Sequence, residues 1–215
     1  MKNLYIIGAG GFGREVLWLV ERINENKHEW DFQGFIDDNP KIWHSVIDGY
    51  EVLGGCEYLC SVGHDIWVVC AIGSSKIRKR VIEKIEACSH IHFAVLIDPS
   101  VIKSDKVDIG DGAIICAGTI ITVNVKVGKH NIINLDCTIG HDAVLEDFVT
   151  LYPSVNVSGL SKIGARTEMG TGAQTIQGIH VGCDTIVGAG AVIIRALPDK
   201  CTAVGIPAKP IHFFD

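Results

Sequence analysis

Residues 133–151 read INLDCTIGHDAVLEDFVTL, and within this stretch Ile133, Ile139, Leu145 and Leu151 stand six residues apart. The same step runs from residue 109 to residue 193, where fourteen of the fifteen positions carry Ile, Val, Leu or Met. The residue two places before each position is usually small, and side chains two apart on a strand share one face. The period therefore predicts brief strands that each point one small and one aliphatic side chain inward.

Glycine is frequent directly after the aliphatic position. It stands there at Gly110, Gly128, Gly140, Gly164, Gly170, Gly182 and Gly188. Glycine adopts backbone conformations that other residues avoid, so we expect the chain to turn corners at these positions. One six-residue unit cannot bury its own apolar residue, whereas stacked coils share a narrow core, and a β-solenoid is therefore predicted. The alternative is an evenly spaced β-sandwich, whose turns recur every ~8–12 residues.

The residues before the repeat have a different pattern. An apolar run at 4–7 leads into the glycine-rich stretch 8–13, and apolar residues then recur at helical spacing over 16–23. Further apolar runs lie at 32–36 and 66–72, the second followed by a helix cap at Ser74-Ser75 and a helical pattern over 76–88. Strands that alternate with helices indicate a small parallel α/β unit. We predict a Rossmann-like domain at 1–93 and the solenoid, with a C-terminal tail, at 94–215.

The composition excludes several classes of protein. The 215 residues are 47% hydrophobic and 20% charged, which is too apolar for intrinsic disorder, and the net charge of −6 argues against a nucleic-acid partner. No apolar run is long enough to cross a membrane. The eight cysteines form no C-x-x-C pair, so neither a disulfide framework nor a metal site is expected, and the chain is predicted to be cytoplasmic.

Stretches in both halves resemble one family. The repeat from Ile109-Gly110-Asp111-Gly112-Ala113 onward is similar to the hexapeptide-repeat acyltransferases. Together with Gly34-Phe35-Ile36-Asp37-Asp38 and the glycine-rich stretch, it resembles the nucleotide-sugar and sialic-acid acetyltransferases, including the bacillosamine-pathway N-acetyltransferase. The resemblance covers essentially the whole chain. It implies a left-handed parallel β-helix with three hexapeptides per coil, acetyl-CoA as co-substrate, and a homotrimer with active sites between subunits.

Acetyl transfer from a thioester needs a base for the proton of the nucleophile and a donor for the oxygen that becomes negative. Among nine histidines, His141 follows a corner glycine and should project from the solenoid, beside Asp142. The resemblance implies that His141 is the catalytic base and that Asp142 orients it. Gly159 stands eighteen residues later, one coil on, where stacking would bring its N–H beside His141, and the resemblance implies that this amide meets the acetyl carbonyl. No cysteine or serine is visibly paired with His141, so direct attack is expected.

The resemblance also implies binding residues. Thr150, Thr171 and Ala189 match positions that line the acetyl-CoA groove, as does Gly159, and Lys209 in the tail could meet phosphate. Gly10, Gly11, Phe12, Asp37 and Asp38 match the positions that hold the nucleotide sugar. Thr150 and Phe12 depart from relatives that carry histidine there.

The leading interpretation is an acetyl-CoA-dependent N-acetyltransferase of a nucleotide-linked amino sugar, serving the synthesis of a surface polysaccharide or glycan. A sugar or sialic acid O-acetyltransferase is the first alternative. A non-catalytic trimeric nucleotide-sugar-binding protein is the second. The glycine stretch matches G-x-G-x-x-G, which by itself also suggests a nicotinamide-dependent oxidoreductase, but the residues before the repeat are too few for a full dinucleotide-binding domain.

Overall fold

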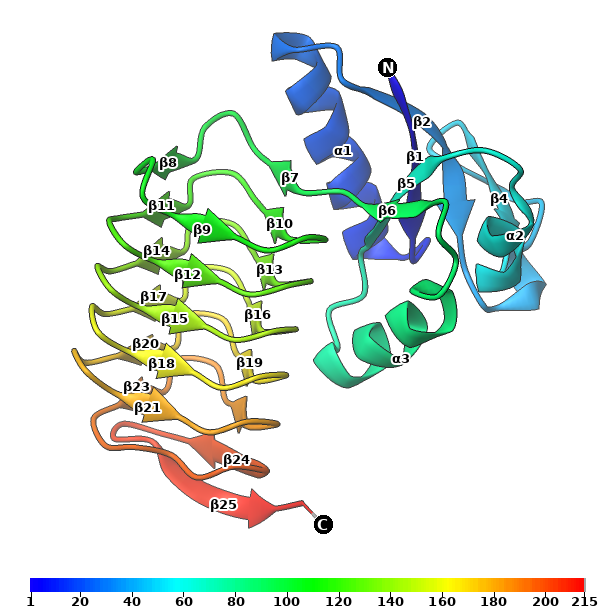
Figure 1. Cartoon of the computed structure of the whole chain (residues 1–215). Helices are drawn as coiled ribbons and strands as arrows, with labels where there is room; N and C mark the ends of the chain where they lie inside the picture. The colour runs from blue at the N-terminus through cyan, green and yellow to red at the C-terminus, as the bar shows by residue number, and fades with distance from the viewer. Residues whose placement is uncertain (215) are drawn as a thin grey trace. The chain divides into compact units, whose positions relative to one another are not determined.

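The structure is a computed structural model and describes residues 1–214. The chain forms two compact units, Met1–Pro99 and Ser100–Asp215 (Figure 1). The division follows Pro99, whereas the boundary predicted from the sequence lies between residues 93 and 94. The first unit is an α/β domain. The second is a left-handed parallel β-helix, as the resemblance implied.

The first unit contains one six-stranded sheet in the order β3-β4-β2-β1-β5-β6, which is parallel except for the β3–β4 hairpin. Its strands are β1 (Lys2–Ile7), β2 (Trp30–Ile36), β3 (Val46–Ile47), β4 (Tyr50–Gly54), β5 (Ile66–Cys70) and β6 (Ile91–Phe93), with β7 (Leu96–Ile97) following. Its helices are α1 (Gly11–Asn26), η1 (Pro40–Ile42), α2 (Cys56–Ser61) and α3 (Ser75–Ile85). Within residues 1–214, none of the helices combines the length and apolar character that a membrane crossing requires.

The apolar runs predicted as strands are β1, β2 and β5, and the two helical patterns are α1 and α3. Helix α1 buries Val16, Leu17 and Val20, the spacing on which its prediction rested. Gly13 allows this close packing, because a Cβ added there would collide with the carbonyl oxygen of Gly8. The β3–β4 hairpin, α2 and β6 were not predicted, because these short elements carry little periodic signal.

The second unit is built from two-residue strands joined by four-residue turns. They are β8 (Ile102–Lys103), β9 (Asp108–Ile109), β10 (Ile114–Ile115), β11 (Ile120–Ile121), β12 (Lys126–Val127), β13 (Ile132–Ile133), β14 (Thr138–Ile139), β15 (Val144–Leu145), β16 (Thr150–Leu151), β17 (Asn156–Val157), β18 (Lys162–Ile163), β19 (Glu168–Met169), β20 (Gln174–Thr175), β21 (His180–Val181), β22 (Ile186–Val187) and β23 (Val192–Ile193). The longer strands β24 (Cys201–Val204) and β25 (Lys209–Phe213) form a C-terminal antiparallel hairpin.

Every third strand pairs in parallel, so the coils form three faces. The first face contains β10, β13, β16, β19, β22 and β24, the second contains β8, β11, β14, β17, β20 and β23, and the third contains β9, β12, β15, β18 and β21. We call the turns after first-face strands, at 135, 153, 171 and 189, the first edge. The turns after second-face strands, at 123, 141, 159 and 177, form the second edge, and those at 129, 147, 165 and 183 form the third.

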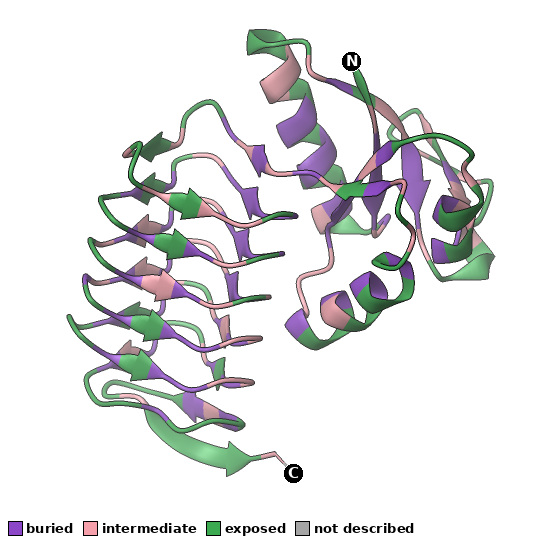
Figure 2. Cartoon of the chain, viewed as in Figure 1, coloured by how far each residue is buried: buried purple, intermediate pink, exposed green. Residues whose placement is uncertain are grey.

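The inward positions form the core of the solenoid. Ile133 pairs with Leu151 in the next coil and both are fully buried, as are Ile115 and Ile163 (Figure 2). From residue 115 to residue 193, no position of the six-residue series is more than 5% exposed. The small residues two places earlier, such as Ala113 and Cys137, are buried with them. The predicted pattern of one small and one aliphatic inward residue is confirmed.

The role that we predicted for the glycines after the aliphatic positions was wrong. Left-handed backbone occurs two residues further along each turn, for example at Asp142 (φ 59°) and Arg166 (φ 59°), and not at those glycines. Instead, a Cβ on Gly140 would lie 2.5 Å from the backbone nitrogen of Gly159, and one on Gly164 would lie 2.6 Å from that of Cys183. These glycines allow consecutive coils to approach closely.

The burial of the core side chains predicts how the protein's stability responds when one of them is shortened. Because Leu151 is fully buried between coils, Leu151→Ala should lower the free energy of unfolding by about 2–5 kcal/mol, the usual result of a core cavity. Leu160, which is 53% exposed, provides a matched control. Leu160→Ala should change the free energy of unfolding by less than about 0.5 kcal/mol. Urea denaturation followed by circular dichroism measures both. Equal effects would contradict the assignment of the core.

Candidate active site

His141 lies on the second edge, in the turn between β14 and β15. Its imidazole is 49% exposed, and its Nδ1 lies 2.9 Å from Oδ2 of Asp142, whose side chain is 43% exposed. An ionised carboxylate can only accept a hydrogen bond, so Nδ1 carries the proton in this pair. The neutral imidazole then has its lone pair on Nε2, where a general base needs it.

Asp142 is held in its charged form by its neighbours. The hydrogen bond from His141 is the largest cause that lowers the pKa of Asp142 below its usual value, and a hydrogen bond from Asn124 adds to it. The Asn124 Nδ2 atom lies 3.2 Å from Oδ1 of Asp142 and belongs to the equivalent turn one coil earlier. Stacking of the coils therefore supplies a carboxylate that is anchored on one side and holds the imidazole on the other.

Gly159 lies directly beside the imidazole. A Cβ added to Gly159 would be 2.6 Å from Nε2 of His141, so any side chain at this position would displace the ring. The two turns are joined by the backbone bond from Leu160 N–H to the His141 carbonyl, at 2.8 Å. Within residues 1–214, the N–H of Gly159 has no acceptor. The structure thus brings a proton acceptor and an open amide donor together, as the one-coil spacing predicted.

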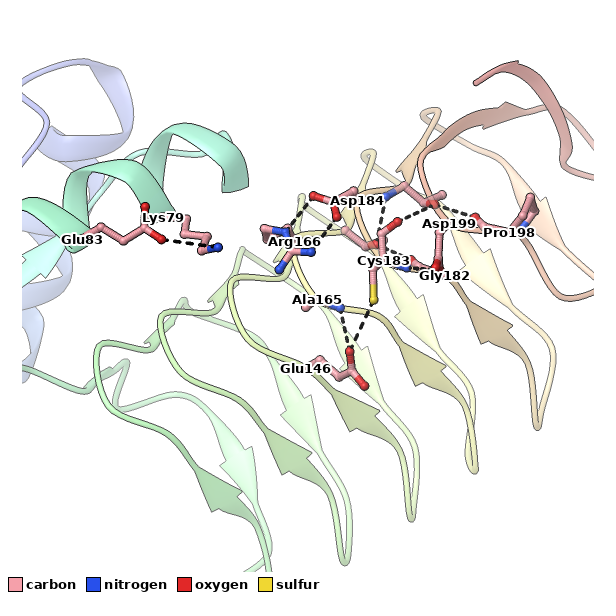
Figure 3. A network of polar contacts seen from close by, with 12 residues as sticks. Lys79, Glu83, Glu146, Ala165, Arg166, Gly182, Cys183, Asp184, Pro198 and Asp199 are labelled. Carbon is pink, nitrogen blue, oxygen red and sulfur yellow. Dashed lines mark hydrogen bonds and ion pairs between the residues drawn. The ribbon is translucent and has the colours of Figure 1, made fainter. Parts of the chain in front are cut away.

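On the third edge, three of the four equivalent amides, those of Lys129, Ala165 and Cys183, donate to carboxylates. Oε2 of Glu146 accepts from the N–H of Ala165 at 2.9 Å, and Oδ1 of Asp199 accepts from that of Cys183 at 2.8 Å (Figure 3). Arg166 and Asp184 form a bidentate ion pair there, with N–O distances of 2.7 and 2.6 Å. Most amide donors of the third edge are therefore taken by carboxylates, whereas the N–H of Gly159 on the second edge is open.

A shallow groove of about 260 Å³ lies on the second face next to His141. It is lined by Ile120, Thr122, Thr138, Ile139, Gly140, Asn156, Val157 and Ser158. Two of its polar residues bond to each other across coils, since Thr138 Oγ1 donates to Asn156 Oδ1 at 2.6 Å. This groove could not be predicted from the sequence, because outward positions vary freely and carry no periodic signal.

The residues expected to contact acetyl-CoA do not all lie together. Thr171 and Ala189 occupy the first edge, one coil apart, and the N–H of Gly190 donates to the Thr171 carbonyl at 2.8 Å. Thr150 lies within strand β16 on the first face instead of on that edge. Within one chain, Thr171 and Ala189 are separated from His141 by the width of the second face.

Lys209 lies in β25 beside a second cavity of about 250 Å³. Ile194, Arg195, Pro207 and Ala208 line it with Lys209. Arg195 brings a second cation to this cavity, and it was not predicted because it precedes the tail motif. Two cations in one cavity fit a phosphate group better than a single lysine does.

In the first unit, the glycine stretch forms the N-terminus of α1, with Gly10 as its N-cap. A Cβ on Gly10 or Gly11 would meet nothing within 4 Å, so the outer side of this loop is open. The N–H groups of the first helical turn, including that of Phe12, have no intrahelical partner and favour an anion. Asp37 is brought to this loop, because its Oδ2 accepts from the N–H of Ala9 at 3.1 Å.

Asp38 points in a different direction from Asp37. Its carboxylate accepts from the N–H of Cys56 at 3.0 Å and from Lys84 Nζ at 2.6 Å. Partial burial raises the pKa of Asp38, but the bonds from Lys84 and Cys56 outweigh it, so the pKa lies below its usual value. The exposed indole of Trp43, which donates to the Asp37 carbonyl at 2.7 Å, was not anticipated from the sequence. The structure therefore places Asp37, but not Asp38, at the glycine loop.

A left-handed β-helix with a histidine and an open amide on one edge, preceded by a glycine-loop α/β unit, defines a hexapeptide-repeat protein. The model of the PglD N-terminal domain matches residues 3–85. GDP-perosamine N-acetyltransferase of Escherichia coli O157:H7 is 30% identical in an alignment of 215 positions that covers 96% of each chain.

Two solved structures resemble the whole chain. PerB from Caulobacter crescentus, in complex with CoA and GDP-perosamine, gives a TM-score of 0.88 at 30% identity and covers 99% of this chain and 98% of that one. The acetyltransferase domain of PglB from Neisseria gonorrhoeae FA1090, in complex with acetyl coenzyme A, gives 0.88 at 31% identity and covers 98% and 99%. The chain therefore belongs to the hexapeptide-repeat acetyltransferase family that includes GDP-perosamine N-acetyltransferase.

The Asp142 contacts predict how its titration responds to substitution. In His141→Ala, the pKa of Asp142 should rise towards its ordinary value, because the hydrogen bond that chiefly favours the carboxylate is lost. Asn124→Ala should raise it less. The carboxyl carbon resonance of Asp142, followed by NMR during acid titration, measures both, and His180→Ala on β21 serves as the control that leaves it unchanged. An unaltered pKa in His141→Ala would contradict the described pair.

Proposed function

We propose that the chain transfers an acetyl group from acetyl-CoA to an amino group of a nucleotide-linked sugar. The observation that carries this proposal is the contact of Nε2 of His141 with Gly159, whose N–H is open. The relatives support it, because the name of the Escherichia coli relative specifies N-acetyl transfer to GDP-perosamine. The PerB structure contains CoA and GDP-perosamine, and the PglB structure contains acetyl-CoA. The same groups would also acetylate a hydroxyl, but nothing in the site favours this O-acetyltransferase alternative.

In the proposed reaction, Nε2 of His141 takes the proton from the sugar amine while the amine nitrogen attacks the thioester carbonyl. The Gly159 N–H donates to the carbonyl oxygen as it becomes negative. Asp142 stabilises the resulting imidazolium, which then returns the proton to the departing CoA sulfur. An amide bond forms and the carbon–sulfur bond breaks, so the histidine ends as it began.

A covalent acyl-enzyme is not part of this proposal. Ser158, next to Gly159, is the hydroxyl nearest in sequence to the donor amide, but its Oγ donates to the Thr175 carbonyl at 2.6 Å. It is therefore engaged away from the imidazole, and a nucleophilic serine requires a base as its hydrogen-bond partner. This supports direct transfer to the amine.

The first unit is proposed to hold the nucleotide sugar. Its diphosphate would meet the open N–H groups at Gly10, Gly11 and Phe12, and Asp37 would accept from ribose hydroxyls. Each Asp37 oxygen retains a lone pair beyond its bonds to backbone N–H groups. Asp38 is proposed to support this loop indirectly, since Lys84 and the N–H of Cys56 occupy its carboxylate.

The acetyl-CoA groove is proposed to lie between prisms of a homotrimer. Thr171 and Ala189 lie on the first edge and His141 lies on the second, so one site can use both edges when neighbouring copies contribute one each. The cavity with Arg195 and Lys209 would receive a phosphate of CoA. We further propose that the reaction occurs in the cytoplasm, where acetyl-CoA is available and free cysteines persist, and that it serves polysaccharide or glycan synthesis.

Removal of the proposed base tests the chemistry. His141→Ala should lower kcat by about 10²–10⁴-fold with acetyl-CoA and a panel of GDP-, UDP- and dTDP-linked amino sugars, because the amine keeps its proton. Asp142→Asn should lower kcat less, because orientation of the imidazole is weakened and not abolished. Release of free CoA thiol measures the rate. His180→Ala, an exposed histidine on the third face, should retain wild-type turnover, whereas full activity of His141→Ala would eliminate the proposed base.

Mixed trimers test the proposed position of the site. His141→Ala and Ala189→Trp should each be inactive alone, the second because a bulky side chain blocks the first edge. When the two are unfolded and refolded together, activity should reappear, because some interfaces then pair an intact first edge with an intact second edge. Light scattering should give the mass of three chains. A site contained within one chain would give no recovery.

A further inference from the structure

Thr175 is the one residue that is not aliphatic among the fifteen positions of the six-residue series from 109 to 193. It points inward from β20 and is 5% exposed. The other positions show that Val or Ile serves the packing of this narrow core, and burying a hydroxyl has a cost unless it is hydrogen-bonded. The Thr175 hydroxyl must therefore be explained by its contacts.

The hydrogen bonds between coils change at Thr175. Elsewhere, the N–H after an inward residue donates to the carbonyl of the inward residue one coil later, as Gly140 does to Val157 and Gly164 does to Val181, both at 2.8 Å. At the equivalent place, the N–H of Ser158 donates to Oγ1 of Thr175 at 2.9 Å. The Thr175 carbonyl instead accepts from the Ser158 hydroxyl at 2.6 Å.

This exchange of partners occurs at the turn that carries Gly159. Ser158 immediately precedes Gly159, so its two bonds to Thr175 anchor the residue at which the peptide unit with the open N–H begins. Oγ1 of Thr175 is also 3.3 Å from Oγ of Ser161, two residues beyond Gly159. Thr175 therefore contacts the turn on both sides of the glycine without touching His141 or the groove.

We propose that Thr175 is a positioning residue that sets the direction of the Gly159 N–H for the developing oxyanion. The inference rests on the proposed function, because it assigns a purpose to the amide that this function requires. An aliphatic residue at 175 would preserve the core but remove the Oγ1 acceptor that the N–H of Ser158 uses here, so the hydrogen bonds of Ser158 would have to rearrange. The Gly159 peptide could then rotate, and stabilisation of the oxyanion depends on donors that are held in place before reaction.

Three variants distinguish a positioning role of Thr175 from a general effect on the stability of the protein. Thr175→Val removes the hydroxyl at nearly constant volume, and Thr175→Ser retains it. The matched control is Thr167→Val, because Thr167 is fully buried, its Oγ1 accepts from the N–H of Thr185 at 3.2 Å, and it donates to the Gly182 carbonyl at 2.6 Å. Thr167 thus makes the same kind of interior bond, away from Gly159.

Thr175→Val should lower kcat by about 10-fold, less than the ~10²–10³-fold loss that follows complete removal of an oxyanion donor. The KM values for acetyl-CoA and the nucleotide sugar should stay within about twofold, since Thr175 contacts neither. Thr175→Ser should recover most of kcat, and Thr167→Val should keep the wild-type kcat although its melting temperature falls similarly. Hydrogen exchange of the Ser158 amide should accelerate in Thr175→Val alone.

Wild-type kcat in Thr175→Val, together with faster exchange at Ser158, would overturn the positioning role and leave the proposed function intact. An equal loss of kcat in Thr167→Val would overturn it as well, because the effect would then follow stability. If the wild-type protein acetylated no nucleotide sugar, the proposed function and this inference would fall together, while the exchange result would still report on the hydrogen bond.

Discussion

The stacking of coils in strict register is the constraint on which the structure depends. Each residue of the solenoid lies against the one eighteen positions away, as Ile133 lies against Leu151, and this neighbour relation repeats along the faces. The register buries the inward side chains in one narrow column, and it also selects which outward groups meet. His141 and Gly159 are brought together by the same relation that builds the core. Packing and site geometry therefore have one common cause in this unit.

The groups of the candidate site are held in fixed orientations by that register. An imidazole alone on a turn is free to rotate, but His141 is held by Asp142, and Asp142 is held by Asn124 from the coil before. On the other side, Gly159 contributes only backbone, so its donor is as rigid as the coil itself. Asn124, the His141–Asp142 pair and Gly159 thus come from three consecutive coils. Groups held in this way need little rearrangement if charge develops beside them.

The fold could be predicted from the sequence because burial in a slim prism repeats in the sequence itself. The pairing of His141 with Gly159 followed from the same period. The predictions that were wrong or missing depended on contacts that the period does not reveal. The glycines after the aliphatic positions are required because the backbones of consecutive coils approach closely there. In the sequence, this requirement looks the same as a need for left-handed backbone. Asp37 and Asp38 are adjacent yet point apart, and Arg195 meets Lys209 only through the final hairpin. Thr175 was visible as a break in the pattern, but its meaning needed the altered hydrogen bonds at Ser158.

The three-faced coil also restricts how such a chain can change length during evolution. Insertion or loss of a single hexapeptide would keep every local pattern intact and every inward residue apolar. It would nevertheless shift all later residues round by one face, so that a histidine and a glycine on opposite sides of the change would no longer share an edge. Only a gain or loss of a whole coil preserves their alignment. This solenoid can therefore gain or lose residues only in steps of eighteen wherever the turns of His141 and Gly159 must remain in line.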